Sequence, residues 1–278
     1  MRIVDRGSGP PLVLIPGIQG RWEYMRPAVE ALSRAFRVIT FSLCDEPSSR
    51  HAFDSARGFD NYVDQVRAVL DQCKIERTIV CGISFGGLIA IRFAAAHPDR
   101  TGGLILASTP GRGWHLNRRH ESYARRPYLL GPLFVVESPW RLRRELGAAL
   151  PDRQTRWRFA RSQILTLLGA PLSLPRMARR ARMIATIDLV EDCASITTPT
   201  LVVTGERGLD QVVSVDDSVG YVSLIRGARG AVLERTGHLG WITRPDAFSA
   251  IVRDFATGHL DRGVRLQPDR DRRAPEVA

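Results

Sequence analysis

A serine lies between two glycines in the pentapeptide Gly82-Ile83-Ser84-Phe85-Gly86. An apolar run precedes this segment and a helix-like run follows it. Nucleophilic catalysis by serine needs a hydroxyl exposed on a sharp turn, and the glycines remove side chains that would clash there. The following helix would direct its positive end and its first N–H groups toward a developing oxyanion. Ser84 is therefore the candidate nucleophile for acyl transfer.

A serine nucleophile needs a general base, and His238 is the best placed of the six histidines. It lies in the loop Thr236-Gly237-His238-Leu239-Gly240, directly after the last apolar run. An α/β sheet builds its site from loops at the carboxyl ends of its strands. We therefore expect His238 to remove the proton of Ser84.

The base in turn needs an acid that fixes its tautomer and stabilises its charged form. Four acids follow the strand-like run that ends near Gly205: Glu206, Asp210, Asp216 and Asp217. Asp216 and Asp217 lie in a segment that looks like the first turn of a helix, where the helix dipole favours acidic residues. Asp210 is the preferred candidate, with Glu206 as the alternative.

The elements that must position these residues alternate along the chain between short apolar runs and amphipathic segments. This alternation predicts an α/β fold with a mostly parallel, doubly wound sheet and helices on both faces. The expected strands are residues 2–5, 11–16, 36–41, 78–81, 103–107, 200–203 and 231–233. Helices are expected within residues 30–35, 58–73 and 87–96.

The alternation stops between residues 110 and 196, where the chain is helix-like throughout and is interrupted by prolines. We expect a helical cap insertion there, and an α/β core formed by residues 1–109 and 197–257. Residues 258–278 are rich in Arg, Asp and Pro and lack periodicity, which predicts a disordered tail.

The composition, with 44% hydrophobic and 25% charged residues, is that of a soluble globular protein. No apolar run is long enough to span a membrane, and no secretory signal begins the chain. Its four cysteines are scattered, without the spacing of a metal site. We therefore expect a cytoplasmic protein with reduced thiols.

The net charge of +11 is unevenly distributed. The whole excess lies between residues 112 and 190, and the rest of the chain is balanced. The arginines of this segment either form a solvated face or favour an anionic substrate. They carry no recognisable nucleic-acid motif and no interleaved aromatic residues, so no nucleic-acid partner is expected.

Together these motifs resemble the α/β-hydrolase superfamily over residues 1–257, including the chain order Ser, Asp, His. The matching segments are Leu12-Val13-Leu14-Ile15-Pro16-Gly17, Gly82-Ile83-Ser84-Phe85-Gly86-Gly87, Leu201-Val202-Val203-Thr204-Gly205-Glu206, Asp210-Gln211-Val212-Val213 and Thr236-Gly237-His238.

The resemblance implies an oxyanion hole formed by the backbone N–H groups of Ile18 and Phe85, with Gln19 as an alternative to Ile18. Gln19, Trp22 and Tyr24 follow the first long strand closely and are candidate substrate-binding residues. For the two aromatic residues, the alternative is packing beneath the loop.

The sequence thus predicts a serine hydrolase that cleaves a small carboxylic ester or lactone through an acyl-enzyme. It predicts no metal or organic cofactor, and a monomer or homodimer. Two alternatives remain open. One is a C–C bond hydrolase or lyase of the same fold acting on an anionic ketonic substrate. The other is a small-molecule receptor that retains a slow triad.

Overall fold

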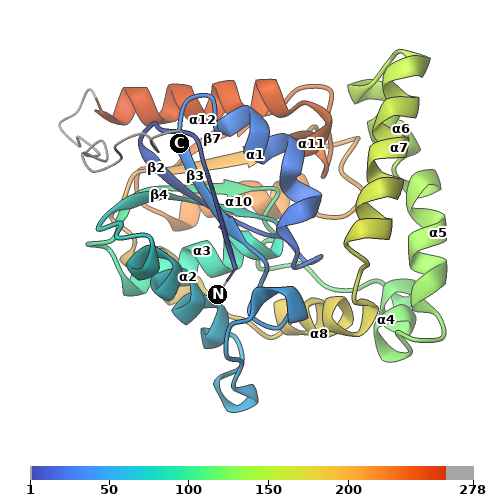
Figure 1. Cartoon of the computed structure of the whole chain (residues 1–278), viewed down its shortest axis with the longest axis horizontal. Helices are drawn as coiled ribbons and strands as arrows, with labels where there is room; N and C mark the ends of the chain where they lie inside the picture. The colour runs from blue at the N-terminus through green and yellow to red at the C-terminus, as the bar shows by residue number, and fades with distance from the viewer. Residues whose placement is uncertain (1, 261–278) are drawn as a thin grey trace, which may run out of the picture.

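The computed structural model describes residues 2–260, which fold around a seven-stranded sheet (Figure 1). The strand order is β1-β3-β2-β4-β5-β6-β7, with β1 antiparallel to β3 and every other pair parallel. The predicted mostly parallel α/β sheet is therefore confirmed. The strands are β1 (Ile3–Arg6), β2 (Pro11–Ile15), β3 (Arg37–Phe41), β4 (Thr78–Ile83), β5 (Thr101–Ala107), β6 (Thr200–Thr204) and β7 (Arg229–Val232).

Helices cover both faces of the sheet because alternate strand residues point to opposite sides. Leu12 and Leu14 pack on one face with η1, α1, α11 and α12, whereas Val13 and Ile15 pack on the other with α2, α3, α9 and α10. The bounds on the first face are η1 (Trp22–Met25), α1 (Arg26–Leu32), α11 (Gly240–Thr243) and α12 (Pro245–Leu260). On the second face they are α2 (Asp60–Gln72), α3 (Phe85–Ala96), α9 (Val190–Ser195) and α10 (Val215–Leu224). Two short 3₁₀ helices, η2 (Pro47–Ser49) and η3 (Ser55–Arg57), follow β3.

Between β5 and α9 the chain forms five helices that lie to one side of the sheet (Figure 1). They are α4 (Arg118–Arg125), α5 (Gly131–Arg141), α6 (Arg143–Ala149), α7 (Arg153–Gly169) and α8 (Leu174–Ile184), and we call them the helical insertion. The helix α9 belongs instead to the core, because Cys193 is fully buried against the sheet face that α3 covers.

At the other end of the chain, α12 continues to Leu260, past the expected core boundary at residue 257. The rest of the predicted tail, residues 261–278, lies outside the described residues. Within residues 2–260, no helix has both the length and the apolar character to cross a membrane.

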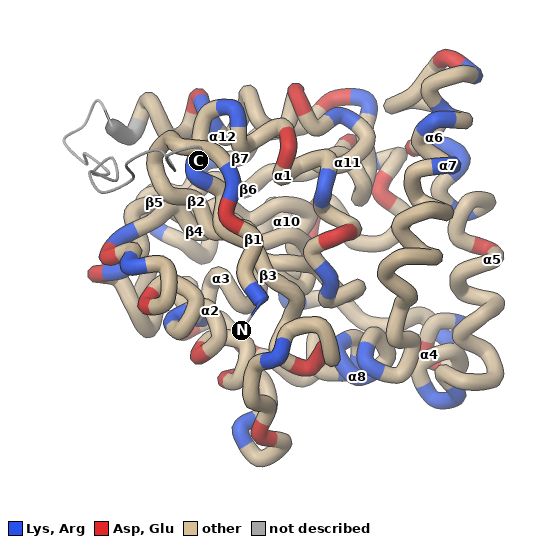
Figure 2. Tube along the Cα trace, in the orientation of Figure 1, with Lys and Arg blue, Asp and Glu red and all other residues tan. Residues whose placement is uncertain are grey.

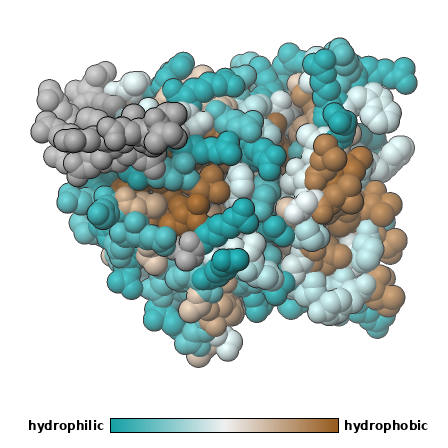
Figure 3. All heavy atoms as spheres, in the orientation of Figure 1, coloured by the Kyte–Doolittle hydropathy of each residue, from teal (hydrophilic) through white to brown (hydrophobic). Residues whose placement is uncertain are grey.

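Much of the helical insertion carries apolar side chains in solvent, and hydrophobic atoms gather over α5 and α7 in Figure 3. In α7, which the structure describes in full, no side chain is buried. The exposed large apolar residues of these two helices are Leu133, Val136, Trp140, Trp157, Ile164, Leu165 and Leu168. The insertion is therefore held to the core mainly by contacts at other helices.

One such contact is a buried ionic cluster formed by Arg180 of α8 with Asp45 and Glu46, which follow β3. All three side chains are almost completely buried, and Arg180 Nη2 donates to Glu46 Oε1 at 2.6 Å. Arg180 also donates through Nη1 to the carbonyl of Ile18 at 2.8 Å. Gly20 makes room for this guanidinium, since a Cβ there would lie 2.2 Å from Arg180 Nη1.

Asp45 is held in its ionised form despite its burial. Desolvation acts to raise its pKa, but the charge and hydrogen bonds of Arg180, with hydrogen bonds from Arg179 and Tyr62, keep the pKa below its usual range. Arg180 therefore joins α8 to the loop after β3 by ion pairs and to the loop after β2 by a hydrogen bond.

Replacing Arg180 by Met should lower the free energy of unfolding by about 3–5 kcal/mol, because buried Glu46 would lose its cation and Asp45 would keep only Arg179. Urea denaturation at neutral pH measures this change. Arg34→Met is the control, since its pair with Asp246 is about 70–75% exposed and should contribute about 1 kcal/mol or less. Equal losses in both variants would contradict the assigned role of the cluster.

Candidate active site

Ser84 is the residue between the end of β4 and the start of α3, and its backbone is in the left-handed region, with φ of 52°. A non-glycine residue there is strained and persists only when its surroundings fix it. The Ser84 N–H donates to the carbonyl of Ala107 at 2.8 Å, and its carbonyl accepts from the N–H of Gly87 at 2.8 Å. Strand pairing and the first helical turn thus hold the serine at the tip of a sharp turn.

The glycines of this turn are required by close backbone packing. A Cβ on Gly82 would lie 2.3 Å from the carbonyl oxygen of Gly86, and a Cβ on Gly86 would lie 2.4 Å from that of Ile15. Any larger residue at either position would force the strand and helix apart.

His238 and Asp210 lie together at the same edge of the sheet, in the loops after β7 and β6. The Nδ1 of His238 is 3.4 Å from Asp210 Oδ2, and both side chains are buried. The other carboxylate oxygen of Asp210 accepts the N–H groups of Val212 and Val213, each at 2.9 Å. Asp210 is thus oriented by its own loop and faces the imidazole.

This pairing stabilises the charged forms of both groups. Burial acts to lower the pKa of His238, but the Asp210 charge and hydrogen bond, with a smaller contribution from Glu145, raise it above its ordinary value. Burial acts to raise the pKa of Asp210, and His238 with the two backbone donors lowers it. The arrangement favours a proton on His238 Nδ1, which leaves Nε2 available as a base.

The other acids considered for this role have different partners. Glu206 Oε1 accepts the N–H of Arg235 at 2.6 Å, and Asp216 pairs with Arg207. Asp217 lies in the first turn of α10, where its N–H is capped by the Ser214 hydroxyl. Among the four candidates, the structure brings Asp210 to His238.

The loop after β2 lies directly beside Ser84. A Cβ built on Gly17 would lie 3.5 Å from the Cβ of Ser84 and 3.3 Å from Gln19 Oε1. The Ile18 carbonyl is occupied by Arg180, which fixes the peptide that follows Ile18. Phe85, on the other side of the serine, is the first residue of α3, so its N–H has no acceptor within the helix.

The two aromatic residues after this loop have structural contacts. Trp22 packs in the core beneath η1 with Leu12 and Met25, which corresponds to the alternative that we considered for it. Tyr24 donates its hydroxyl to the carbonyl of Ala170 at 2.8 Å, and burial raises its pKa to about 12. Tyr24 thus connects η1 to the end of α7.

Glu145 of α6 is a site residue that the sequence reasoning missed. Its side chain is completely buried, and Oε1 accepts the N–H of Leu239, the residue after His238, at 2.5 Å. No local pattern marks this acid, because it lies in a helical segment where arginines dominate.

A hollow of about 650 Å³ lies between the loop after β3 and α8. Its wall is rich in cationic side chains, and Figure 2 shows basic residues gathered along α8 and α4. The basic residues that line it are Arg50, His51, Arg176, Arg179 and Arg182. Asp45 and Glu46 also line it, but they are paired with Arg179 and Arg180.

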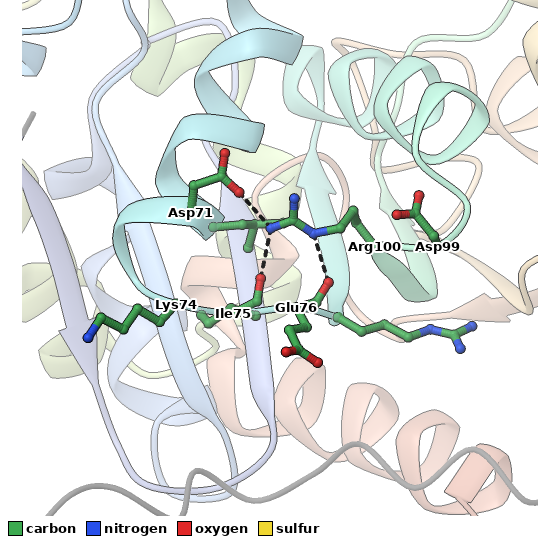
Figure 4. Close-up of a pocket in the computed structure, with 8 residues that line it drawn as sticks. Asp71, Lys74, Ile75, Glu76, Asp99 and Arg100 are labelled. Atoms are coloured by element: carbon green, nitrogen blue, oxygen red, sulfur yellow. Dashed lines mark hydrogen bonds and ion pairs between the residues drawn. The ribbon is translucent and has the colours of Figure 1, made fainter.

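A second hollow, of about 670 Å³, lies at the opposite edge of the sheet, where β4 and β5 begin (Figure 4). Arg100 crosses it and donates to Asp71 and to the carbonyls of Ile75 and Glu76. It is remote from Ser84 at the other end of β4 and takes no part in the candidate site. In the described part of the chain, no group of three or more His, Cys, Asp or Glu residues is arranged to hold a metal ion.

Comparison with known proteins shows that this chain is similar to hydrolases. The model of the alpha/beta hydrolase family matches residues 12–251. The 2-hydroxymuconate semialdehyde hydrolase of Pseudomonas sp. is 27% identical, covering 90% of this chain and 88% of its own. The 3-oxoadipate enol-lactonase 1 of Acinetobacter baylyi is 25% identical, covering 85% and 83%.

A solved structure has the same fold. The enol-lactonase from Burkholderia xenovorans aligns with a TM-score of 0.73 and 23% identity, covering 92% of this chain and 96% of its own.

Replacing Asp210 by Asn should lower the pKa of His238, because the imidazolium would lose its nearest negative charge while burial still disfavours it. Titration of the histidine by NMR measures the shift. Glu206→Gln is the matched control, because the Glu206 carboxylate accepts the backbone N–H of Arg235 and does not contact His238. A larger shift in the control than in Asp210→Asn would identify Glu206 as the functional acid.

Proposed function

The chain belongs to the α/β-hydrolase family, and we propose that this hydrolase is a serine enzyme that cleaves a carboxylic ester or lactone through an acyl-enzyme. The observation that carries the proposal is the strained turn at Ser84, which lies at the same sheet edge as the buried His238–Asp210 pair. The enol-lactonase relative supports this class of substrate.

The chemistry follows from the roles that we assign to the three residues. His238 Nε2 takes the Ser84 proton as Oγ attacks the carbonyl carbon, and Asp210 stabilises the imidazolium that results. The N–H groups of Ile18 and Phe85 hold the oxyanion, and the leaving alcohol takes its proton from His238. Water then repeats the sequence and releases the acid.

The pH dependence follows from the direction of the His238 pKa. The base must be neutral to accept a proton, and its pKa is raised by Asp210 and Glu145. Activity should therefore rise with pH through a value above the ordinary pKa of histidine.

We assign the helical insertion the role of a cap over this site. It is fastened to the loops that flank Ser84 and His238 by Arg180, Tyr24 and Glu145. The arginines that line the hollow beside α8 would attract a substrate that carries a carboxylate, because guanidinium groups bind carboxylates strongly. Neither Ser84 nor His238 lines this hollow. In this arrangement Gln19 can contact substrate, whereas Trp22 and Tyr24 support the loop and the cap.

Hydrolysis of a carbon–carbon bond in an anionic ketonic substrate is the second candidate. The relationship to 2-hydroxymuconate semialdehyde hydrolase favours it, and so does the same arginine-lined hollow. Such an enzyme would be weak on simple esters, because its site would be organised around a ketonic group.

Ser84→Ala should reduce ester or lactone hydrolysis by about 10⁴-fold or more, since it removes the nucleophile. The measurement uses a panel of p-nitrophenyl esters and lactones, with and without a carboxylate, and a 2-hydroxy-6-oxo-dienoate as the C–C substrate. Labelling of Ser84 by a fluorophosphonate tests its nucleophilicity independently of any substrate.

The outcomes separate the candidates. Rapid turnover of the esters or lactones that Ser84→Ala abolishes supports the proposal. Turnover of the dienoate alone would replace it by C–C hydrolysis. A folded protein with an unlabelled Ser84 and no turnover would exclude both, and would leave a ligand-binding receptor.

A further inference from the structure

Resting on the proposed function, we propose that Glu145 is a positioning residue for His238, supplied by the insertion. Its carboxylate holds the backbone of the histidine loop and places a second negative charge beside the imidazole.

Glu145 contacts the loop that carries His238 through one short hydrogen bond. Its Oε1 accepts the N–H of Leu239, the residue after His238, at 2.5 Å. A second contact reinforces the first, since Arg235 Nε donates to the carbonyl of Ala148 at 3.1 Å.

Packing alone does not explain a carboxyl group at this position. The Glu145 side chain is fully buried, and its Oε2 has no hydrogen-bond partner among the described residues. A neutral amide would satisfy the Leu239 N–H without the cost of burying a charge. The negative charge is useful only if a cation forms nearby, and His238 becomes a cation when it takes the serine proton.

The pKa of Glu145 is raised overall, because burial and the Asp210 charge outweigh the backbone donors and His238. A positive charge on His238 therefore favours the ionised form of Glu145. The reciprocal effect is present, because Glu145 raises the pKa of His238 beyond what Asp210 achieves. Asp210 and Glu145 therefore both favour the imidazolium form of His238.

The other charged groups around Glu145 either have partners other than Glu145 or lie on α6 itself. α11, packed against α6, contains no ionisable residue. In α5, which also packs against α6, Glu137 binds Arg119 and Tyr123, and Arg141 contacts His120. The remaining groups are Arg235, which binds Ala148, and Arg143 and Arg144 of α6 itself.

The test replaces Glu145 by Gln, which keeps an oxygen to accept the Leu239 N–H but removes the charge. Removing a nearby anion makes the imidazolium less stable, so the His238 pKa should fall. The neutral base should then persist to lower pH, with a proton affinity about three- to tenfold lower. Glu121→Gln is the matched control, because it removes one acid from an exposed pair with Arg125 on α4.

Two measurements report the shift in the His238 pKa. The rate of Ser84 labelling by a fluorophosphonate is measured from pH 5 to pH 9, and His238 is titrated by NMR in the same variants. Both midpoints should move to lower pH in Glu145→Gln and stay at the parent value in Glu121→Gln. Glu145→Ala also removes the acceptor of the Leu239 N–H, so it should lower the plateau labelling rate about tenfold. The plateau rate of Glu145→Gln should stay near that of the parent protein.

Unchanged midpoints in Glu145→Gln would overturn the inference, since a merely structural contact would leave the titration untouched. Failure to label Ser84 in the parent protein would overturn the proposed function instead. In that case the NMR titration would still decide whether Glu145 acts on His238, so the two failures are distinguishable.

Discussion

The candidate site depends on the pairing of β4 with β5, because the last bond of that ladder holds the strained serine. The N–H of Ser84 donates to Ala107, so the nucleophile is fixed by the same hydrogen bonds that build the sheet. A residue at this φ costs of order 1–3 kcal/mol, which the buried strands on either side must offset. Each loop that contacts the serine then follows from the strand order, since β2 and β4 are neighbours and their loops lie side by side.

The insertion is joined to this core by buried charged side chains as well as by apolar burial on α8. Its longest helix, α7, exposes apolar side chains, whereas Arg180 and Glu145 reach into the protein and are fully buried. Each of them binds a loop of the candidate site, Arg180 at the Ile18 carbonyl and Glu145 at the Leu239 N–H. The arginines of the segment therefore include three groups, which are the buried Arg180, those that line the hollow beside α8, and a solvent-exposed set on α7.

The fold and the main site residues could be predicted from the sequence because their signals are local. An apolar run followed by a glycine-flanked serine specifies a strand and a turn, and residues just past strand ends must gather at one edge of a parallel sheet. The same reasoning favoured Asp210 over Glu206, and in the structure Asp210 faces His238.

Glu145 and Arg180 could not be found in this way. Their positions depend on how the insertion folds back on the core, and helical periodicity there does not say which polar residues turn inward. Trp22 shows the reverse case, since its closeness in sequence to Gly17 suggested a pocket residue and the 3₁₀ turn instead directs it into the core.

The packing of the Arg180 guanidinium against Gly20 constrains which segments of such a protein can be exchanged during evolution. Gly20, Asp45 with Glu46, and Arg180 lie on three distant stretches of chain and are packed against one another in one cluster. An insertion inherited from a relative without that arginine would leave Glu46 buried without a cation and an empty space at Gly20. We therefore expect recombination to preserve this cluster only when the insertion is exchanged together with the loops after β2 and β3.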